Sequence, residues 1–237
     1  MQIRAYKTRI FKENVDLVDF ILKYLPKVNE CDILVVTSKI VALSEGRTAQ
    51  LSNEKVREQL IKKESDFALK TKYTWLTIKD GMVMSSAGID ESNADGKIVL
   101  LPKDSFASAK LLHTKLVKIY KVKKLGIIIS DSAILPLRNG TVASALGYAG
   151  FKGVRNYVGK KDIFGKILKM SRVNIADSLA TASVVCMGEG NERKPLAKIS
   201  DAPVEFIAKV NRKEVTIKLE DDIFYPLLKN IFYAKKK

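Results

Sequence analysis

Two runs of apolar residues constrain the fold of this chain most. Cys31–Ser38 reads CDILVVTS and Leu125–Ser130 reads LGIIIS, with very few polar side chains in either run. Continuous apolar runs of this length are typical of strands covered on both faces of a sheet. We therefore expect both runs to be buried central strands, the second ending abruptly at Asp131-Ser132.

The remaining pattern mixes helices and strands. Apolar spacing and capping residues predict helices over residues 14–25, 53–70, 104–120, 174–186 and 221–234. Short strands are expected at 97–101 and 213–218, and Asp80-Gly81 predicts a hairpin joining 74–79 to 82–86. Because no linker or repeat interrupts the sequence, we expect one α+β domain over residues 1–237, with mixed sheets and packed helices.

The chain is strongly basic. It has 42 Lys and Arg against 26 Asp and Glu, a formal charge of +16, which favours anionic partners such as nucleotides. A nucleic-acid-binding module is an alternative that rests on charge alone, and Trp75 and the tyrosines form no stacking pattern, so we expect no specific nucleic-acid partner. Without an apolar run of about 18 residues or a signal-peptide core, we expect no membrane association and a cytoplasmic location.

Histidine and cysteine chemistry has little to build on. His113 is the only histidine and falls in the predicted helix 104–120, so we place it at the edge of that helix. A histidine-rich metal site is excluded within one chain, and a Ser-His-Asp triad would depend on His113 alone. Cys31 and Cys186 are isolated and suggest neither a zinc site nor a disulfide framework.

Three acidic loops follow apolar elements. Carboxylate and hydroxyl oxygens are ligands that Mg²⁺ and Mn²⁺ prefer. Each loop taken alone is more typical of a turn or a helix cap than of a metal site, and Glu91 in the first loop reads as a turn or surface charge. The loops would form a site only if the fold brought them together; they are Asp90 with Asn93, Asp131 with Ser132, and Glu189 between Gly188 and Gly190.

The order of the motifs carries a family resemblance. Neither a Walker A loop nor a dinucleotide fingerprint is present. Instead, the ordered motifs resemble those of the coenzyme F-420 gamma-glutamyl ligase family, most strongly over residues 30–195, and this chain is identified as a divergent member. The matching segments are residues 32–39 (DILVVTSK), 44–47 (SEGR), 87–93 (AGIDESN), 129–132 (ISDS), 159–165 (GKKDIFG), 176–180 (ADSLA) and 187–190 (MGEG).

The resemblance implies a fold and an activity. The family fold is a two-lobed α+β intertwined homodimer. The implied enzyme is a ligase that uses GTP and a divalent metal to join L-glutamate to an acceptor carboxylate, by way of an acyl phosphate. The acceptor would be a deazaflavin coenzyme precursor or a similar cofactor. A folate-type polyglutamylating ligase, or a degenerate relative that binds nucleotide or metal without ligating, are the alternatives.

The resemblance also assigns residues. Asp90 and Asp131 would hold one Mg²⁺ or Mn²⁺, and Ser132 and Glu189 a second, with K⁺ a further candidate cation. Arg138 would act with the two aspartates in catalysis by holding phosphate or carboxylate groups, for which its bidentate fork is suited. The nucleotide-binding residues would be Ser38, Lys39, Asn93, Met187, Gly188 and Gly190.

This chain departs from the family at several anion-binding positions. Leu43 stands where many relatives have a nucleotide-contacting lysine, and Ile134-Leu135 stands where a glycine-arginine pair is usual. Residues 7–10 (KTRI) replace a nucleotide loop, which leaves base selectivity open. The predicted metal positions are retained, so the sequence favours retained chemistry and leaves the identity of the acceptor open.

Overall fold

The structure is a computed structural model that describes residues 1–50, 53–94 and 96–233. These residues form two compact units, Met1–Arg47 with Pro102–Arg212, and Thr48–Leu101 with the residues from Lys213 onward. Both units combine helices with strands, and the mixed sheets confirm the predicted α+β class. The single domain, the two-lobed arrangement and the homodimer stay predictions.

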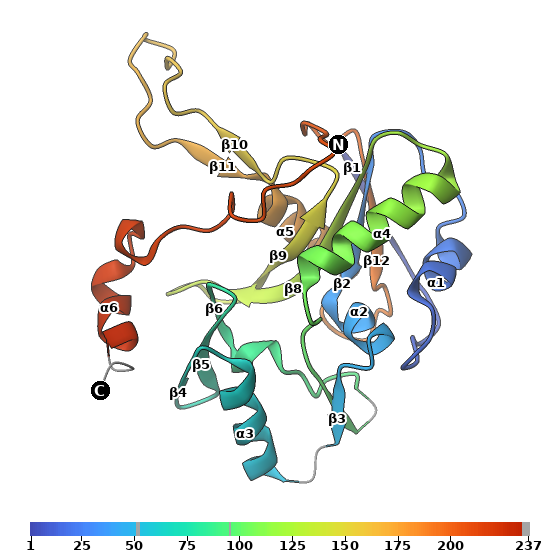
Figure 1. The fold of residues 1–237 in the computed structure, drawn as a ribbon, viewed down its shortest axis with the longest axis vertical. Coiled ribbons are helices and arrows are strands. Elements are labelled where there is room, and N and C mark those ends of the chain that lie inside the picture. The colour runs from blue at the N-terminus through green and yellow to red at the C-terminus, as the bar shows by residue number, and fades with distance from the viewer. Residues whose placement is uncertain (51–52, 95, 234–237) are drawn as a thin grey trace. The chain divides into compact units, whose positions relative to one another are not determined.

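A five-stranded sheet forms the centre of the first unit (Figure 1). The two apolar runs are its adjacent parallel strands, paired from Asp32 with Leu125 to Thr37 with Ser130. All other pairings in this sheet are antiparallel. The strand order is β1 (Gln2–Tyr6), β12 (Leu196–Ser200), β2 (Asp32–Thr37), β8 (Leu125–Ile134) and β9 (Thr141–Ala149).

Helices cover both faces of this sheet. The core on one face joins Leu34, Val36, Ile127 and Ile129 to α1 (Leu17–Tyr24), α2 (Ser38–Ser44) and α4 (Ser105–Tyr120). The alternate residues Ile33, Val35 and Ile128 are also buried, because α5 (Ile175–Met187) packs on the opposite face (Figure 1). Burial on both faces explains the continuous apolar runs.

Polar side chains fix where the helices begin. The Asp104 carboxylate accepts the Ala107 N–H at 3.0 Å, and the Asn174 side chain accepts the Asp177 N–H at 3.0 Å, as N-caps do. These two helices confirm the predictions over 104–120 and 174–186. The first helix begins at Leu17 instead of residue 14, because Asn14 adopts the left-handed conformation at φ 59°.

The strand β8 does not end at Asp131-Ser132 as expected. It runs on to Ile134, and the final pair of its ladder with β9 is Ile134 with Thr141. The register shifts between Ile129 and Ser130. The neighbouring strand supplies hydrogen bonds that keep a polar Asp-Ser pair extended.

A long arm leaves the first unit between β10 (Val154–Asn156) and β11 (Arg172–Asn174) (Figure 1). The sequence pattern did not predict it. Three apolar side chains along its loop are almost fully exposed, Ile163 at 92%, Phe164 at 89% and Met170 at 84%.

The second unit holds two small sheets. The predicted hairpin is confirmed as β5 (Trp75–Lys79) and β6 (Met82–Ser85), with Asp80 and Gly81 at φ 52° and 78°, the signs of a type I′ turn. The remaining elements are β3 (Thr48–Gln50) paired with β7 (Lys97–Val99), α3 (Glu54–Glu64), β4 (Phe67–Lys70) and α6 (Tyr225–Tyr233).

Three expected elements of this unit differ in the structure. The helix predicted over 53–70 is capped by Asn53 but stops at Glu64, because Phe67–Lys70 pairs with β5. The strand predicted over 213–218 does not form, since Thr216 Oγ1 donates to the Lys213 carbonyl at 3.0 Å and closes a local turn. The last helix begins at Tyr225, and its predicted end at residue 234 lies outside the described residues. None of the helices within these residues is long and apolar enough to cross a bilayer.

We expect the free energy of unfolding to decrease between pH 7 and pH 5, in part through His113. Burial lowers the pKa of this half-buried imidazole, against an opposing hydrogen bond with the Leu125 backbone. The unfolded chain therefore binds the proton more readily, and stability is lost as the pH falls below about 6.5. Urea unfolding of His113→Gln across this range should show a flatter pH dependence than wild type. His113 is the only histidine. An unchanged pH dependence of the free energy of unfolding in the variant would therefore contradict a lowered pKa of His113.

Candidate functional site

The carboxyl end of β2 brings Ser38 to Asp131. β2 ends at Thr37 and α2 begins at Ser38, while the parallel neighbour β8 continues. The buried Ser38 hydroxyl donates to Asp131 Oδ1 at 2.7 Å. The carboxyl ends of strands in α/β sheets are common places for ligand binding.

The end of α5 brings Glu189 to Ser132. The helix stops at Gly188, whose φ of 81° and ψ of 170° suit glycine alone, and its N–H donates to the Val184 carbonyl at 2.8 Å. Directly after this turn, the exposed Glu189 carboxylate accepts the Ser132 hydroxyl at 2.7 Å. Two of the three predicted acidic loops therefore meet at β8, where Glu189 contacts Ser132.

The two halves of this site leave β8 on opposite faces. Successive side chains of a strand alternate, and Asp131 joins α2 while Ser132 joins the end of α5 on the other side of the sheet. This arrangement fits two separate cation positions better than one shared cluster. All the donors are hard oxygens, which suit Mg²⁺ or Mn²⁺.

Neither pair would surround a cation by itself. Within residues 1–50, 53–94 and 96–233, no group of three or more His, Cys, Asp or Glu side chains is placed to hold a metal ion. A cation bound here would complete its shell with phosphate oxygens or water, as Mg²⁺ commonly does.

The other site residues predicted in the first unit differ in how exposed their side chains are. Lys39 is half-buried in the first turn of α2, beside Ser38. The Met187 side chain is buried, with 4% exposed, so a nucleotide contact there would have to use the backbone. The Gly190 N–H donates to Glu192 at 2.8 Å, and Arg138 lies exposed beyond the end of β8.

Asp90 and Asn93 belong to the second unit. The Asp90 backbone pairs in both directions with Val99, at 3.0 and 2.9 Å. Its carboxylate accepts the Ser92 N–H at 2.7 Å and the Ser92 hydroxyl at 3.0 Å, which makes a compact Asx turn. Asn93 is exposed and left-handed at φ 53°. The expected sharing of a cation by Asp90 and Asp131 stays a prediction.

Two further motif residues hold the first unit together. The Glu45 carboxylate accepts the Lys103 N–H at 2.9 Å and the Ser108 hydroxyl at 2.6 Å, which fixes the start of α4. The Asp177 carboxylate accepts the Ala145 N–H at 2.8 Å and so ties α5 to β9; burial raises its pKa. These contacts give the SEGR and ADSLA motifs a structural role.

The position that lacks the expected lysine is part of the core. Leu43 is half-buried and packs against the cluster formed by α1, α2 and α4. Its carbonyl accepts the Asn14 N–H at 3.0 Å. The leucine therefore contributes to packing where a lysine would contact a nucleotide.

Comparison with known proteins identifies the family of this chain. The family model for F420-0:Gamma-glutamyl ligase matches residues 5–201. A protein of Methanococcus maripaludis named coenzyme F420:L-glutamate ligase is 34% identical over 230 residues, covering 90% of this chain and 91% of the relative. Proteins of the same name from Methanocaldococcus jannaschii and Archaeoglobus fulgidus are 32% and 28% identical, covering 94% and 93% of this chain and 96% and 94% of their own lengths. With matches along almost its whole length, the chain belongs to the F420-0:gamma-glutamyl ligase family.

Proposed function

We propose that this protein is a GTP- and divalent-metal-dependent gamma-glutamyl ligase that joins L-glutamate to the carboxylate of a deazaflavin coenzyme precursor. The observation that carries the proposal is the match over residues 5–201 to a family whose relatives are named for ligation of coenzyme F420 with L-glutamate. The +16 formal charge fits substrates that are all anions.

An amide bond does not form between a carboxylate and an amine at neutral pH without activation. In the proposed reaction the acceptor carboxylate takes the γ-phosphoryl group of GTP, giving an acyl phosphate and GDP. The α-amine of glutamate then attacks the acyl carbon, loses a proton, and expels inorganic phosphate. Bound Mg²⁺ or Mn²⁺ would offset the repulsion between triphosphate and carboxylate and stabilise the charge that develops on phosphoryl transfer.

The chain's own residues would orient these groups. The hydroxyl of Ser38 holds Oδ1 of Asp131, and in the proposal this carboxylate serves one cation together with Asp90. Ser132 and Glu189, already in contact, would serve the second. Arg138 is proposed to hold phosphate or carboxylate groups, and K⁺ is a further candidate ion. The proposed nucleotide contacts are Ser38, Lys39, Asn93, Met187, Gly188 and Gly190.

A second copy of the chain is a proposed partner. Ile163, Phe164 and Met170 on the arm between β10 and β11 are almost fully exposed, and apolar side chains gathered on a projecting segment favour association. An intertwined homodimer would cover them. Light scattering coupled to size exclusion would measure the mass, and a monomer at micromolar concentration would contradict this part of the proposal.

The activity is tested by mixing the full chain with GTP, Mg²⁺, L-glutamate and one acceptor at a time. Mass spectrometry should show the deazaflavin precursor gaining one glutamyl residue, together with GDP formation. Glutamylation of folate alone would move the protein to the folate-type alternative, and ATP in place of GTP tests the nucleotide. Calorimetric binding of GTP and Mn²⁺ without any product would favour a non-catalytic relative. Leu43, which packs against the core in place of the expected lysine, supports that alternative.

A further inference from the structure

The chain approaches Asp90 through a turn of unusual backbone conformation. Ser86, Ala87 and Gly88 have φ of 50°, 56° and 70° in succession. Side chains other than glycine enter this region at a steric cost. Both Ser86 and Ala87 are buried, at 3% and 1% exposed. Such a conformation persists only where the surroundings impose it.

One buried hydroxyl group bonds directly to the backbone of this turn, which the Ile89 N–H also closes by donating to the Ser86 carbonyl at 2.9 Å. Thr77 on β5 is 0% exposed, and its Oγ1 donates to the Met84 carbonyl at 2.8 Å. The same oxygen accepts the Ala87 N–H at 2.7 Å. The side chain of Thr77 therefore links β6 to the left-handed turn, and it supplies the hydrogen-bond acceptor for the Ala87 N–H.

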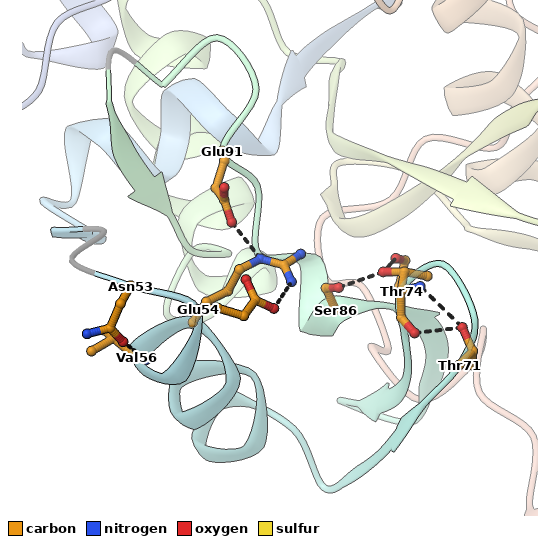
Figure 2. Close-up of polar contacts among 9 residues, drawn as sticks. Asn53, Glu54, Val56, Thr71, Thr74, Ser86 and Glu91 are labelled. Atoms are coloured by element: carbon orange, nitrogen blue, oxygen red, sulfur yellow. Dashed lines mark hydrogen bonds and ion pairs between the residues drawn. The ribbon is translucent and has the colours of Figure 1, made fainter.

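A second threonine supports the turn from the edge of the hairpin. Thr74 Oγ1 lies 2.9 Å from the Ser86 hydroxyl and 3.0 Å from the Ser85 hydroxyl. Figure 2 shows Thr74 and Ser86 facing each other. A side chain on Gly88 would collide with Leu101, so glycine is required at the last position of the turn.

The residue after Asp90 is fixed as well. Glu91, which the sequence pattern made a turn or surface charge, lies 2.5 Å from Nε of Arg57 on α3, and Arg57 also pairs with Glu54 at 3.3 Å. Figure 2 shows Glu91 pointing toward this helix. Asp90 therefore lies between two anchored segments. The sequence pattern singled out neither Arg57 nor Thr77. The signal for Thr77 was a hydroxyl group between the apolar residues Leu76 and Ile78 of its strand.

We infer that Thr77 is a positioning residue for the cation site, because its hydroxyl holds the Ser86–Gly88 turn that sets the direction of Asp90. The inference rests on the proposed function, in which Asp90 is a cation ligand. Thr77 acts through the backbone of the turn and touches neither the cation nor the substrates. Mutation of residues that hydrogen-bond directly to a metal ligand typically lowers metal affinity 10- to 100-fold, and we take this range for a residue that holds the ligand's backbone.

The test compares Mn²⁺ affinity in Thr77→Val, Thr77→Ser and Thr71→Val variants of the full chain. Thr71 is the control, because its hydroxyl also makes two hydrogen bonds in this unit, both with the backbone of Thr74, and none with the turn or with the Thr74 hydroxyl. Electron paramagnetic resonance of free Mn²⁺ in the presence of GTP, referred to a titration of Mn²⁺ with GTP alone, gives the dissociation constant without turnover. We expect Thr77→Val to weaken binding about 10- to 100-fold. Thr77→Ser should restore it to within about threefold, and Thr71→Val should leave it unchanged.

Two further measurements distinguish a loosened turn from a unit that has not folded. Hydrogen exchange over residues 86–91 should accelerate in Thr77→Val, and fluorescence of Trp75, the only tryptophan, verifies folding of this unit. Unchanged Mn²⁺ affinity in Thr77→Val, failure of serine to restore it, or an equal loss in Thr71→Val would overturn the inference. If Thr77→Val does not fold, Thr74→Val takes its place, and we expect it to weaken Mn²⁺ binding as well. A wild-type protein that binds no Mn²⁺ would overturn the ligase proposal itself, and this inference with it.

Discussion

Replacing Asp131 by asparagine is expected to lower kcat for ligation about 1,000-fold, equivalent to roughly 4 kcal/mol of transition-state stabilisation. In the proposed mechanism the carboxylate holds a cation, and a neutral amide is a much weaker ligand for a hard metal ion. The fold should not suffer, because the amide oxygen of asparagine can still accept the Ser38 hydroxyl that now donates at 2.7 Å. Glutamyl transfer to the acceptor and urea unfolding would be measured on the same preparation.

Asp32 supplies the matched control on the neighbouring strand. Its buried carboxylate also accepts a serine hydroxyl, from Ser200 at 2.6 Å, and lies 3.3 Å from the Lys198 ammonium group. Asp32→Asn should lower the free energy of unfolding by about 2 kcal/mol, because it removes the partner of a largely buried cation. Its kcat per folded molecule should stay within about twofold of wild type, a change within roughly 0.4 kcal/mol. Full activity in Asp131→Asn, or a similar loss of activity in both variants, would contradict a metal-binding role for Asp131.

The parts of the fold that sequence patterns predicted are those where one local signal dominates. β2 and the first half of β8, Leu125–Ile129, were recognisable because burial on both faces leaves long apolar runs in them. The hairpin at Asp80-Gly81 was recognisable because few residues adopt two successive positive φ angles. The end of α3 was not predicted, because Phe67–Lys70 becomes a strand only through its partner β5, and a partner distant in sequence leaves no local pattern.

The same limit applies to the candidate site. Motif order pointed to Asp131, Ser132 and Glu189, and the structure brings Ser132 and Glu189 into contact. The separation of Asp131 and Ser132 onto opposite faces required knowing that β8 continues past them, which depends on its ladder with β9. The buried contacts of Thr77 depend on the hairpin and on the turn that follows it.

Replacing Gly150 by alanine is expected to lower the free energy of unfolding by about 4 kcal/mol, the sum of a backbone penalty and a severe collision. Gly150 follows β9 at φ 86°, and a Cβ there would strike the Leu125 carbonyl oxygen and lie 2.9 Å from the His113 ring. The carbonyl oxygen cannot yield easily, because Leu125 begins the central strand β8. For a chain of this size the melting temperature should fall by about 8–16 °C.

Gly159 separates the two contributions. It has nearly the same backbone angle, φ 84°, but an added Cβ would meet no atom within 4 Å. Gly159→Ala should therefore carry the backbone penalty alone, about 1–2 kcal/mol. Urea unfolding followed by circular dichroism would compare the two variants with wild type, and equal losses would show that the collision is relieved by movement of the Leu125 backbone. A larger loss at Gly150 would show that glycine is required where the end of β9 approaches Leu125, at the start of the strand that carries Asp131 and Ser132.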